Sequence, residues 1–232
     1  MREKPIAEFR DISGDSEVVI RRGAAAAGGA AVLSLNPGDG HHAAPRLLAL
    51  LDRHPGLRAH GESVGRLAVA VARRLGFGER DQGDLLLAGR LHDVGKIVIE
   101  DSILAKPGPL SSRELARVRR HPLLGSRILR AAGLVQIASW VLCHHERPDG
   151  RGYPIGLRLD EIPEQSRILA AADACDAMLT NRVYSEALEL GETIAELRRG
   201  AGSQFDPRVV RALLAELDAG PLSGAAREAA AR

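Results

Sequence analysis

The chain has 232 residues, of which 45% are apolar and 27% are charged, close to the averages for globular proteins. This composition excludes a disordered, collagen-like or coiled-coil protein. The 32 basic and 30 acidic residues nearly cancel, so bulk charge indicates neither a nucleic-acid polymer nor a membrane surface as a partner. The length fits one sizeable domain with an extra segment, or two small domains.

Cysteine usage and apolar runs indicate the cellular compartment. Cys143 and Cys175 form no Cys-x-x-Cys pair, and we expect both to be small core residues in a reducing environment. The longest weakly apolar run, residues 23–35, is too short to span a bilayer. Acidic residues precede it, where a signal peptide would carry basic ones. The sequence therefore predicts a soluble, cytoplasmic protein.

The chain divides by composition near residue 43. Residues 1–43 are irregular, with a β-branched run at Val18–Ile20 and a turn-forming stretch from Asn36 to Gly40, and we interpret them as an extension without an assignable domain. Residues 44–218 carry repeated helix-start and helix-stop signals, which predicts an all-α domain. Residues 219–232 are interpreted as a C-terminal tail.

The first predicted helices of this domain lead to two histidines. One helix stops at Gly76, has His60 at its start, and carries an apolar stripe of Val64, Leu67, Ala68, Val71 and Leu75. The next apolar segment runs from Leu85 to Leu91 and ends at His92-Asp93.

In the middle of the chain, further predicted helices also lead to histidines. Ser111 and Glu114 have the spacing of a capping box and predict a helix that runs toward His121. Pro122 would start the following helix. A further apolar segment ends in His144-His145, before a loop rich in glycine and proline.

Two more helices complete the predicted domain. The first carries Asp173 one position away from a stripe of Ile168, Leu169, Ala172, Cys175 and Leu179. Asp206-Pro207 is an N-cap and N1 pair for the last helix, which is predicted to end near Leu217.

Imidazoles and carboxylates gather near the predicted helix ends. Together they suit iron, manganese or zinc better than calcium or copper. If they converge, their number suits two ions bridged by a carboxylate, the geometry used for displacement at phosphorus. Each residue alone also fits an ordinary capping or pairing role, an interpretation we keep for His41, His42 and His54. The candidates are His60, His92, Asp93, His121, His144, His145 and Asp173.

Two motifs carry a family resemblance. Residues 92–96, HDVGK, resemble the signature of the HD metal-dependent phosphohydrolases, and residues 144–154, HHERPDGRGYP, resemble the second signature of their HD-GYP subgroup. The likeness covers about residues 45–217. It implies a helical bundle of the HD phosphohydrolase type. It also implies a phosphodiesterase that hydrolyses cyclic di-GMP to linear pGpG, and in some members onward to GMP.

The resemblance also implies roles for individual residues. The seven candidates would be metal ligands, with Asp93 bridging, and Asp93 and Lys96 would be catalytic. Lys96 and Arg182 match positions that contact substrate phosphate. The cofactors would be two divalent ions, iron or manganese first, with zinc, cobalt or nickel as alternatives, and a hydroxide bridging them would attack phosphorus.

The loop that contains the Gly-Tyr-Pro motif has two interpretations. As a functional element, residues Asp149, Gly152, Tyr153 and Pro154 would position the substrate and contact partner proteins. Alternatively, the glycines and the proline only shape a tight turn whose tyrosine packs on the bundle.

Departures from the family pattern refine these expectations. Gly56 replaces a glutamate that binds a third ion in some members, so we expect two ions. Ser185 stands where a second basic residue is usual, so one phosphate contact is expected to be missing. Two alternatives stay open: a non-hydrolysing nucleotide sensor that acts through the Gly-Tyr-Pro loop, and a phosphohydrolase for another nucleotide. The sequence indicates neither the input signal nor the oligomeric state.

Overall fold

The computed structural model describes residues 7–12, 15–20, 35, 38–52, 54–181 and 187–220. Helices dominate this part of the chain, which confirms the predicted all-α domain. In chain order the elements are β1 (Ala7–Ile12), β2 (Asp15–Ile20), the 3-10 turn η1 (Gly40–Ala43), α1 (Ala44–Leu51), α2 (Pro55–Arg74), α3 (Glu79–Leu91), η2 (Val94–Val98), α4 (Asp101–Leu104), α5 (Ser112–Val118), α6 (His121–Ala131), α7 (Val135–Leu142), η3 (Leu159–Glu161), α8 (Glu164–Leu179), α9 (Leu190–Gly200) and α10 (Pro207–Ala219).

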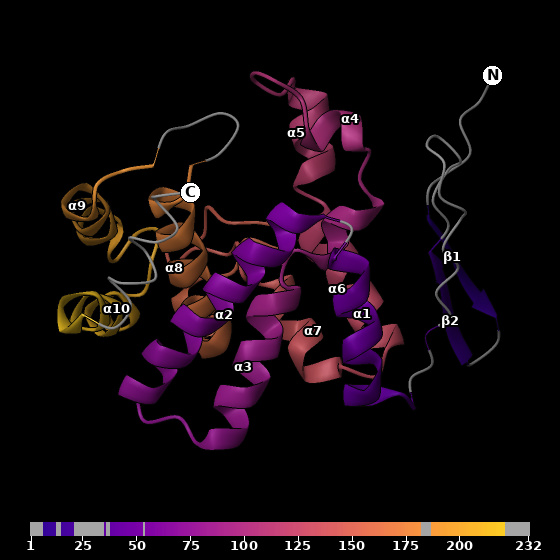
Figure 1. Ribbon diagram of the computed structural model, residues 1–232, viewed down its shortest axis with the longest axis horizontal. Helices are drawn as coiled ribbons and strands as arrows, with labels where there is room; N and C mark the ends of the chain where they lie inside the picture. Colours follow the sequence, from indigo (N-terminus) through magenta and orange to yellow (C-terminus); the bar gives the residue numbers. More distant parts are fainter. Residues whose placement is uncertain are drawn as a thin grey trace.

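The bundle is organised around α2 and α3, which lie side by side in the centre (Figure 1). Helix α8 packs along α2 on one side, and α10 contacts both of these helices. On the other side α7 packs against α3 and α6 packs against α7. Helices far apart in sequence therefore bring their ends to one region in the middle of the bundle.

The expected apolar stripes form the core. The predicted members of α2 from Val64 to Val71 and those of α8 from Ile168 to Leu179 are all buried. Both cysteines are free and buried, as predicted. Burial raises the pKa of Cys143 to about 11 and that of Cys175 to about 12, so neither thiol is a ready nucleophile. Among the described residues, no helix combines the length and apolarity needed to cross a bilayer.

The interpretation of residues 1–43 as irregular is wrong in part. Strands β1 and β2 pair antiparallel with Phe9 opposite Val18, and β2 lies against α6. Charged residues interrupt the apolar pattern of β1, so only the run at the end of β2 was visible as strand-like. The core also reaches beyond the expected domain boundary, because Leu35 and Ala43 are fully buried in it.

Two other expectations about helices need correction. His60 was expected at the start of its helix, but α2 begins at Pro55, which places His60 on the second turn. Helices α1 and α9 were not predicted, although a pair of glutamates caps α9. By contrast, Gly76 takes the left-handed φ of 86° expected after a helix end, and the capping box of Ser111 and Glu114 is present.

Glycines allow α2 and α3 to approach closely. A Cβ atom at Gly89 would lie 2.4 Å from the Cα atom of Gly65, and one at Gly61 would lie 2.7 Å from the carbonyl oxygen of Arg90. Any larger residue would push the two backbones apart. This contact sets the distance between His60 on α2 and His92 at the end of α3, whose ring centroids lie 5.0 Å apart.

We predict that Gly89→Ala lowers the free energy of unfolding by about 1–3 kcal/mol or more, because the added methyl group overlaps backbone atoms that cannot move aside separately. Gly83→Ala is the matched control on the same helix, since a Cβ atom there meets nothing within 4 Å. The control should stabilise the protein by about 0.5–1 kcal/mol through helix propensity. Urea denaturation of both variants tests this, and equal effects would contradict the close contact.

Candidate metal centre

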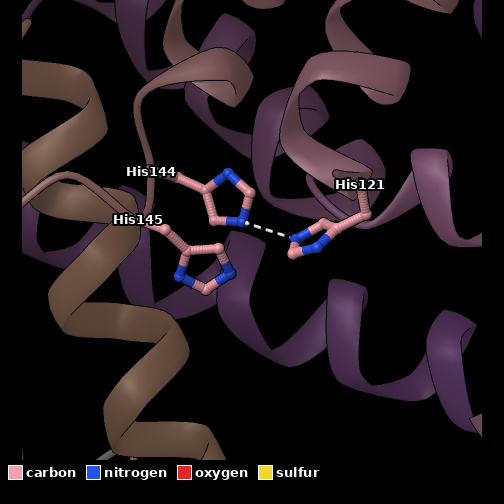
Figure 2. Close-up of side chains that lie close together, drawn as sticks. All are labelled: His121, His144 and His145. Carbon is pink, nitrogen blue, oxygen red and sulfur yellow. Dashed lines mark hydrogen bonds between the residues drawn. The ribbon is translucent and has the colours of Figure 1, made fainter. Parts of the chain in front are cut away.

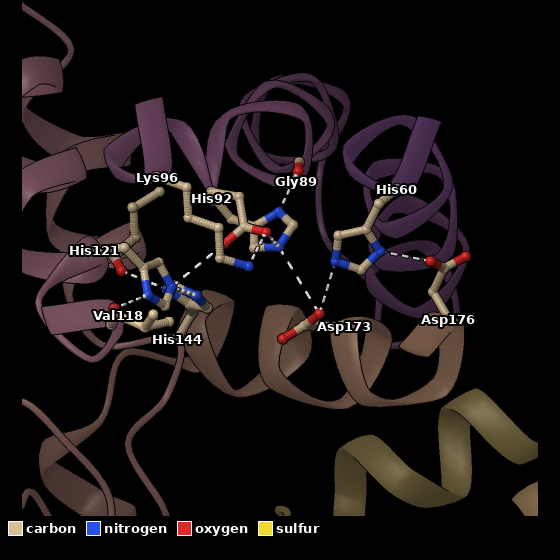
Figure 3. Close-up of polar contacts among 11 residues, drawn as sticks. His60, Gly89, His92, Lys96, Val118, His121, His144, Asp173 and Asp176 are labelled. Carbon is tan, nitrogen blue, oxygen red and sulfur yellow. Dashed lines mark hydrogen bonds and ion pairs between the residues drawn. The ribbon is translucent and has the colours of Figure 1, made fainter. Parts of the chain in front are cut away.

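The structure brings all seven candidate ligands together. Figure 3 shows His60, His92, His121, His144 and Asp173, and Figure 2 shows His145 beside His144. His60 comes from α2, and Asp173 comes from the middle of α8. His92 and Asp93 follow α3, His121 is the first residue of α6, and the pair His144-His145 follows α7. Their donor atoms form three overlapping groups, within each of which all atoms lie within 4.8 Å of one another: His60, His92 and Asp93; His92, His144 and Asp173; and His121, His144 and His145.

Backbone carbonyl groups fix the orientation of three of the imidazoles. The Nδ1 atoms of His92, His121 and His144 lie 2.6–2.8 Å from the carbonyl oxygens of the residues three positions earlier, Gly89, Val118 and Val141. A carbonyl oxygen can only accept a hydrogen bond, so each Nδ1 carries the proton and donates it. In a neutral ring with its proton on Nδ1, the Nε2 atom keeps a lone pair, and in all three residues this atom faces the cluster.

Two of these lone pairs face each other. The Nε2 atoms of His121 and His144 lie 3.3 Å apart (Figure 2). Burial lowers the pKa of His121 to about 4 and that of His144 well below its usual value, so both rings are neutral at pH 7. Two unprotonated nitrogens at this distance repel each other unless a cation lies close to both. The arrangement is typical of imidazoles that share a metal site.

Asp93 lies between the two ends of the cluster. Its Oδ1 atom is 3.3 Å from Nε2 of His121, and its Oδ2 atom is 3.5 Å from Nε2 of His92. Burial alone would raise the pKa of Asp93, but the positive charge of Lys96 beside it helps to hold the pKa well below its usual value. An ionised carboxylate with one oxygen toward each end has the geometry of a bridging ligand.

Two buried polar atoms in the cluster have no hydrogen-bond partner among the described residues. They are Nε2 of His92 and Oδ1 of Asp93, both on side chains at most 4% exposed. An unsatisfied polar group in the interior costs about 1–3 kcal/mol, so such atoms are uncommon without a ligand. The donor types, the lone pairs and these two atoms together fit a divalent transition-metal centre.

The far end of the cluster contains a residue that the sequence analysis missed. Nε2 of His60 lies 2.9 Å from Asp173, while its Nδ1 lies 2.6 Å from Oδ2 of Asp176, one turn further along α8. Burial lowers the pKa of His60, but the two carboxylates outweigh it and raise the pKa to about 9. The signal in the sequence was the Asp-x-x-Asp spacing, which puts both carboxylates on one face of a helix.

The Gly-Tyr-Pro loop packs directly on the cluster. The ring of Tyr153 stacks on His145 with centroids 4.8 Å apart, and the guanidinium carbon of Arg119 lies 5.3 Å from the centre of the same tyrosine ring. Burial raises the pKa of Tyr153, so its hydroxyl group stays protonated and can donate a hydrogen bond. The tyrosine is thus placed beside a candidate metal ligand rather than out in solvent.

Glu146 holds the second half of this loop, and the sequence analysis gave it no role. Its side chain is 2% exposed and accepts hydrogen bonds from the backbone N–H groups of Ile155, Gly156 and Leu157 at 2.6–3.1 Å. A Cβ atom at Gly152 would lie 2.5 Å from the Cα atom of Glu146, so only glycine fits there. The same short segment therefore contains two candidate ligands and the residue that supports the loop.

Not all of the predicted substrate-contact residues lie beside the cluster. The ammonium group of Lys96 is 2.6 Å from Oδ2 of Asp93, at the edge of the cluster. The carboxylate of Asp149 pairs with Arg147 at 2.7 Å and accepts from the N–H of Arg151, which favours the turn-shaping interpretation for this residue. Pro154 is exposed. Arg182 and Ser185 lie outside the described residues.

The histidines given an ordinary role are not members of the ligand groups. His41 lies 3.4 Å from the carboxylate of Asp84 on α3, with its own side chain 67% exposed. His42 is exposed, and His54 immediately precedes α2.

We predict that Glu146→Gln loosens the Gly-Tyr-Pro loop, because an amide replaces one acceptor oxygen with a donor that faces backbone N–H groups. The free energy of unfolding should fall by about 1–3 kcal/mol, and the amides of residues 155–157 should exchange faster with deuterium. Glu164→Gln, in an exposed pair with Arg208, is the control and should change stability by less than about 0.5 kcal/mol. Unchanged exchange in Glu146→Gln would contradict this role.

Comparison with known proteins agrees with this geometry. The family model described as "HD domain" matches residues 47–209. The chain is 42% identical over 165 residues to the cyclic di-GMP phosphodiesterase response regulator RpfG of Xanthomonas campestris, covering 70% of this chain and 44% of that protein. It is 37% identical over 163 residues to 3'3'-cGAMP-specific phosphodiesterase 2 of Vibrio cholerae, covering 69% of this chain and 31% of that protein.

A solved structure gives the same fold. An HDG"Y"P protein from Bdellovibrio bacteriovorus superposes with a TM-score of 0.59 at 21% identity, covering 70% of this chain and 52% of that one. The chain spans less than half the length of the two relatives matched by sequence. The family model covers more than half of the chain, and the helical architecture and the clustered histidines and aspartates agree with it. The chain belongs to the HD domain family.

Proposed function

We propose that this chain is a metal-dependent phosphodiesterase that hydrolyses cyclic di-GMP to linear pGpG. The observation that carries the proposal is the cluster of unprotonated Nε2 atoms around Asp93, which is suited to hold cations that neutralise a phosphodiester. The name of the relative in Xanthomonas campestris supports the choice of substrate. Further cleavage of pGpG to GMP would use the same groups.

The proposed cofactors are two divalent ions, iron or manganese first. His60, His92 and Asp173 would hold one ion, the imidazoles of His121, His144 and His145 the other, and Asp93 would bridge them. Gly56 has no side chain to offer a third ion, so the proposal is limited to two. Zinc, cobalt and nickel accept the same ligands, so the supply of each metal would decide which is bound.

The chemistry divides between the ions and the chain. Bound ions would lower the pKa of water toward neutrality and neutralise phosphate oxygens. Lys96 is 21% exposed on the side chain and can donate to a phosphate oxygen while staying close to Asp93. The hydroxyl group of Tyr153, protonated at neutral pH, can donate to a substrate bound beside His145. Arg182 is proposed as a second phosphate contact.

Two other candidate functions have specific support. The similarity to a phosphodiesterase named for 3'3'-cGAMP favours a different cyclic dinucleotide as substrate. The exposed Ile155, at 58% accessibility beside the Gly-Tyr-Pro motif, favours contact with a partner protein and so a sensor role. We also propose the cytoplasm as the location, where a cyclic dinucleotide would be met.

Chromatography of the products after incubation of the metal-loaded chain with cyclic di-GMP or 3'3'-cGAMP tests these candidates. We expect pGpG to accumulate from cyclic di-GMP. Asp93→Ala should reduce hydrolysis to background while circular dichroism stays helical, because the residue that bridges both ends of the cluster is lost. Asp160→Ala, an exposed aspartate in η3, is the control and should keep activity. Binding of nucleotide without any product would support the sensor instead.

We predict that Lys96→Ala lowers turnover by about 10²- to 10³-fold, the usual effect of removing one donor to a developing charge, and retains two ions per chain. Lys106→Ala is the control, because Lys106 also pairs with a carboxylate, Glu114, at 2.7 Å, in a part-buried pair that is not among the ligand groups. Steady-state kinetics and elemental analysis check both points. Stoichiometric loss of metal in Lys96→Ala would show that the lysine supports Asp93 rather than the phosphate.

A further inference from the structure

The partner of His60 differs from the partners of the other oriented histidines. His92, His121 and His144 donate to carbonyl oxygens three residues earlier in their own chain segments. His60 instead has a carboxylate, Asp176, at 2.6 Å from its Nδ1 atom. Within the described part of the chain, Asp176 has no second hydrogen-bond partner, and its side chain is 7% exposed.

The position of His60 on a helix explains why it needs such a partner. His60 lies on the second turn of α2, where the preceding carbonyl oxygens are already used by the backbone hydrogen bonds of the helix. A side chain from another element must therefore orient the ring. Asp173 and Asp176 are one turn apart on α8 and lie against opposite nitrogens of the same imidazole (Figure 3).

A carboxylate changes the ring more than a carbonyl group does. A hydrogen bond from Nδ1–H to an ionised acceptor is about twice as strong as one to a neutral acceptor, and it raises the basicity of Nε2. The end of the cluster near His60 thus has Asp173 and Asp176 in addition to the shared Asp93. Among the described residues, the group of His121, His144 and His145 contains no carboxylate of its own, and besides Asp93 only Asp173 is grouped with one of its members, His144.

We propose that Asp176 is a positioning residue that makes the His60 end the tighter of the two metal sites. Asp176 does not belong to any of the ligand groups, so it acts on the metal through His60. The inference rests on the proposed centre of two ions. Its consequence is that the two ions bind in a fixed order, with the His60 end filled first.

Metal titration of the full chain tests this proposal. Protein stripped with a chelator is titrated with Mn²⁺, and free Mn²⁺ is followed by electron paramagnetic resonance at constant pH. Wild-type protein should give two dissociation constants. Asp176→Ala should raise the lower one by about 10- to 100-fold, as for other outer-shell partners of a ligating histidine, and leave the higher one within about twofold. Asp176→Asn keeps a hydrogen-bond acceptor without the charge, so its lower dissociation constant should lie between those of the wild-type protein and Asp176→Ala.

The control is Asp84→Ala. Asp84 is also a mostly buried aspartate beside a histidine, His41 at 3.4 Å, but it lies outside the ligand groups. It should leave both constants unchanged. Thermal melts of every variant show whether the fold is kept, and if Asp176→Ala does not fold, Asp176→Asn carries the same prediction at smaller magnitude.

A double-mutant cycle assigns the tighter step to its end of the cluster. His60→Ala should remove this step, and adding Asp176→Ala should then have no further effect on metal affinity. A purely structural role for Asp176 would instead weaken both steps equally, and that result would overturn the proposal, as would two unchanged constants. Wild-type protein that binds one ion or none would contradict the two-ion centre itself, and this inference with it, before any variant is compared.

Discussion

The candidate site depends on the direction in which its imidazoles point. Helices α3, α5 and α7 end in carbonyl groups that have no intrahelical partner, as every helix does. In each case the histidine that follows donates Nδ1–H to one of these carbonyls, at Gly89, Val118 or Val141. The helix end gains a hydrogen bond and the ring is fixed with its Nε2 lone pair toward the centre of the bundle. One interaction, used three times, thus creates a region rich in unprotonated nitrogen.

This arrangement has a thermodynamic consequence for the chain. Buried Nε2 atoms and a buried carboxylate are unfavourable unless a cation balances them, so part of the binding energy of a metal at this site would also be folding energy. The apolar core around the cluster, from α2, α3 and α8, must hold the ligands in place against this cost. The close contact between Gly65 and Gly89 also helps to place these residues, because it sets how near α2 brings His60 to the rest of the cluster.

The sequence could predict which histidines and aspartates the structure brings together. Histidines at helix ends are recognisable from helix-stop signals, and the HDVGK and HHERPDGRGYP motifs identify which ones belong together. What could not be predicted are interactions that join distant segments. Asp176 reaches His60 only because α8 packs on α2, and Glu146 reaches the N–H groups of residues 155–157 only because the loop folds back. The strand β1 was missed because Glu8, Arg10 and Asp11 break its apolar pattern.

The turn after α7 connects two candidate metal ligands to the exposed Gly-Tyr-Pro loop. His144 and His145 supply two imidazoles, and Glu146, the next residue, fixes the loop in which Tyr153 stacks on His145. His144, His145 and Glu146 are consecutive, so the loop held by Glu146 cannot shift far without moving a candidate ligand. Rotation of the His145 ring would also break its stacking with Tyr153. The exposed Ile155 lies in that loop, two residues beyond the tyrosine, and its backbone N–H donates to Glu146, the residue that follows the candidate ligand pair.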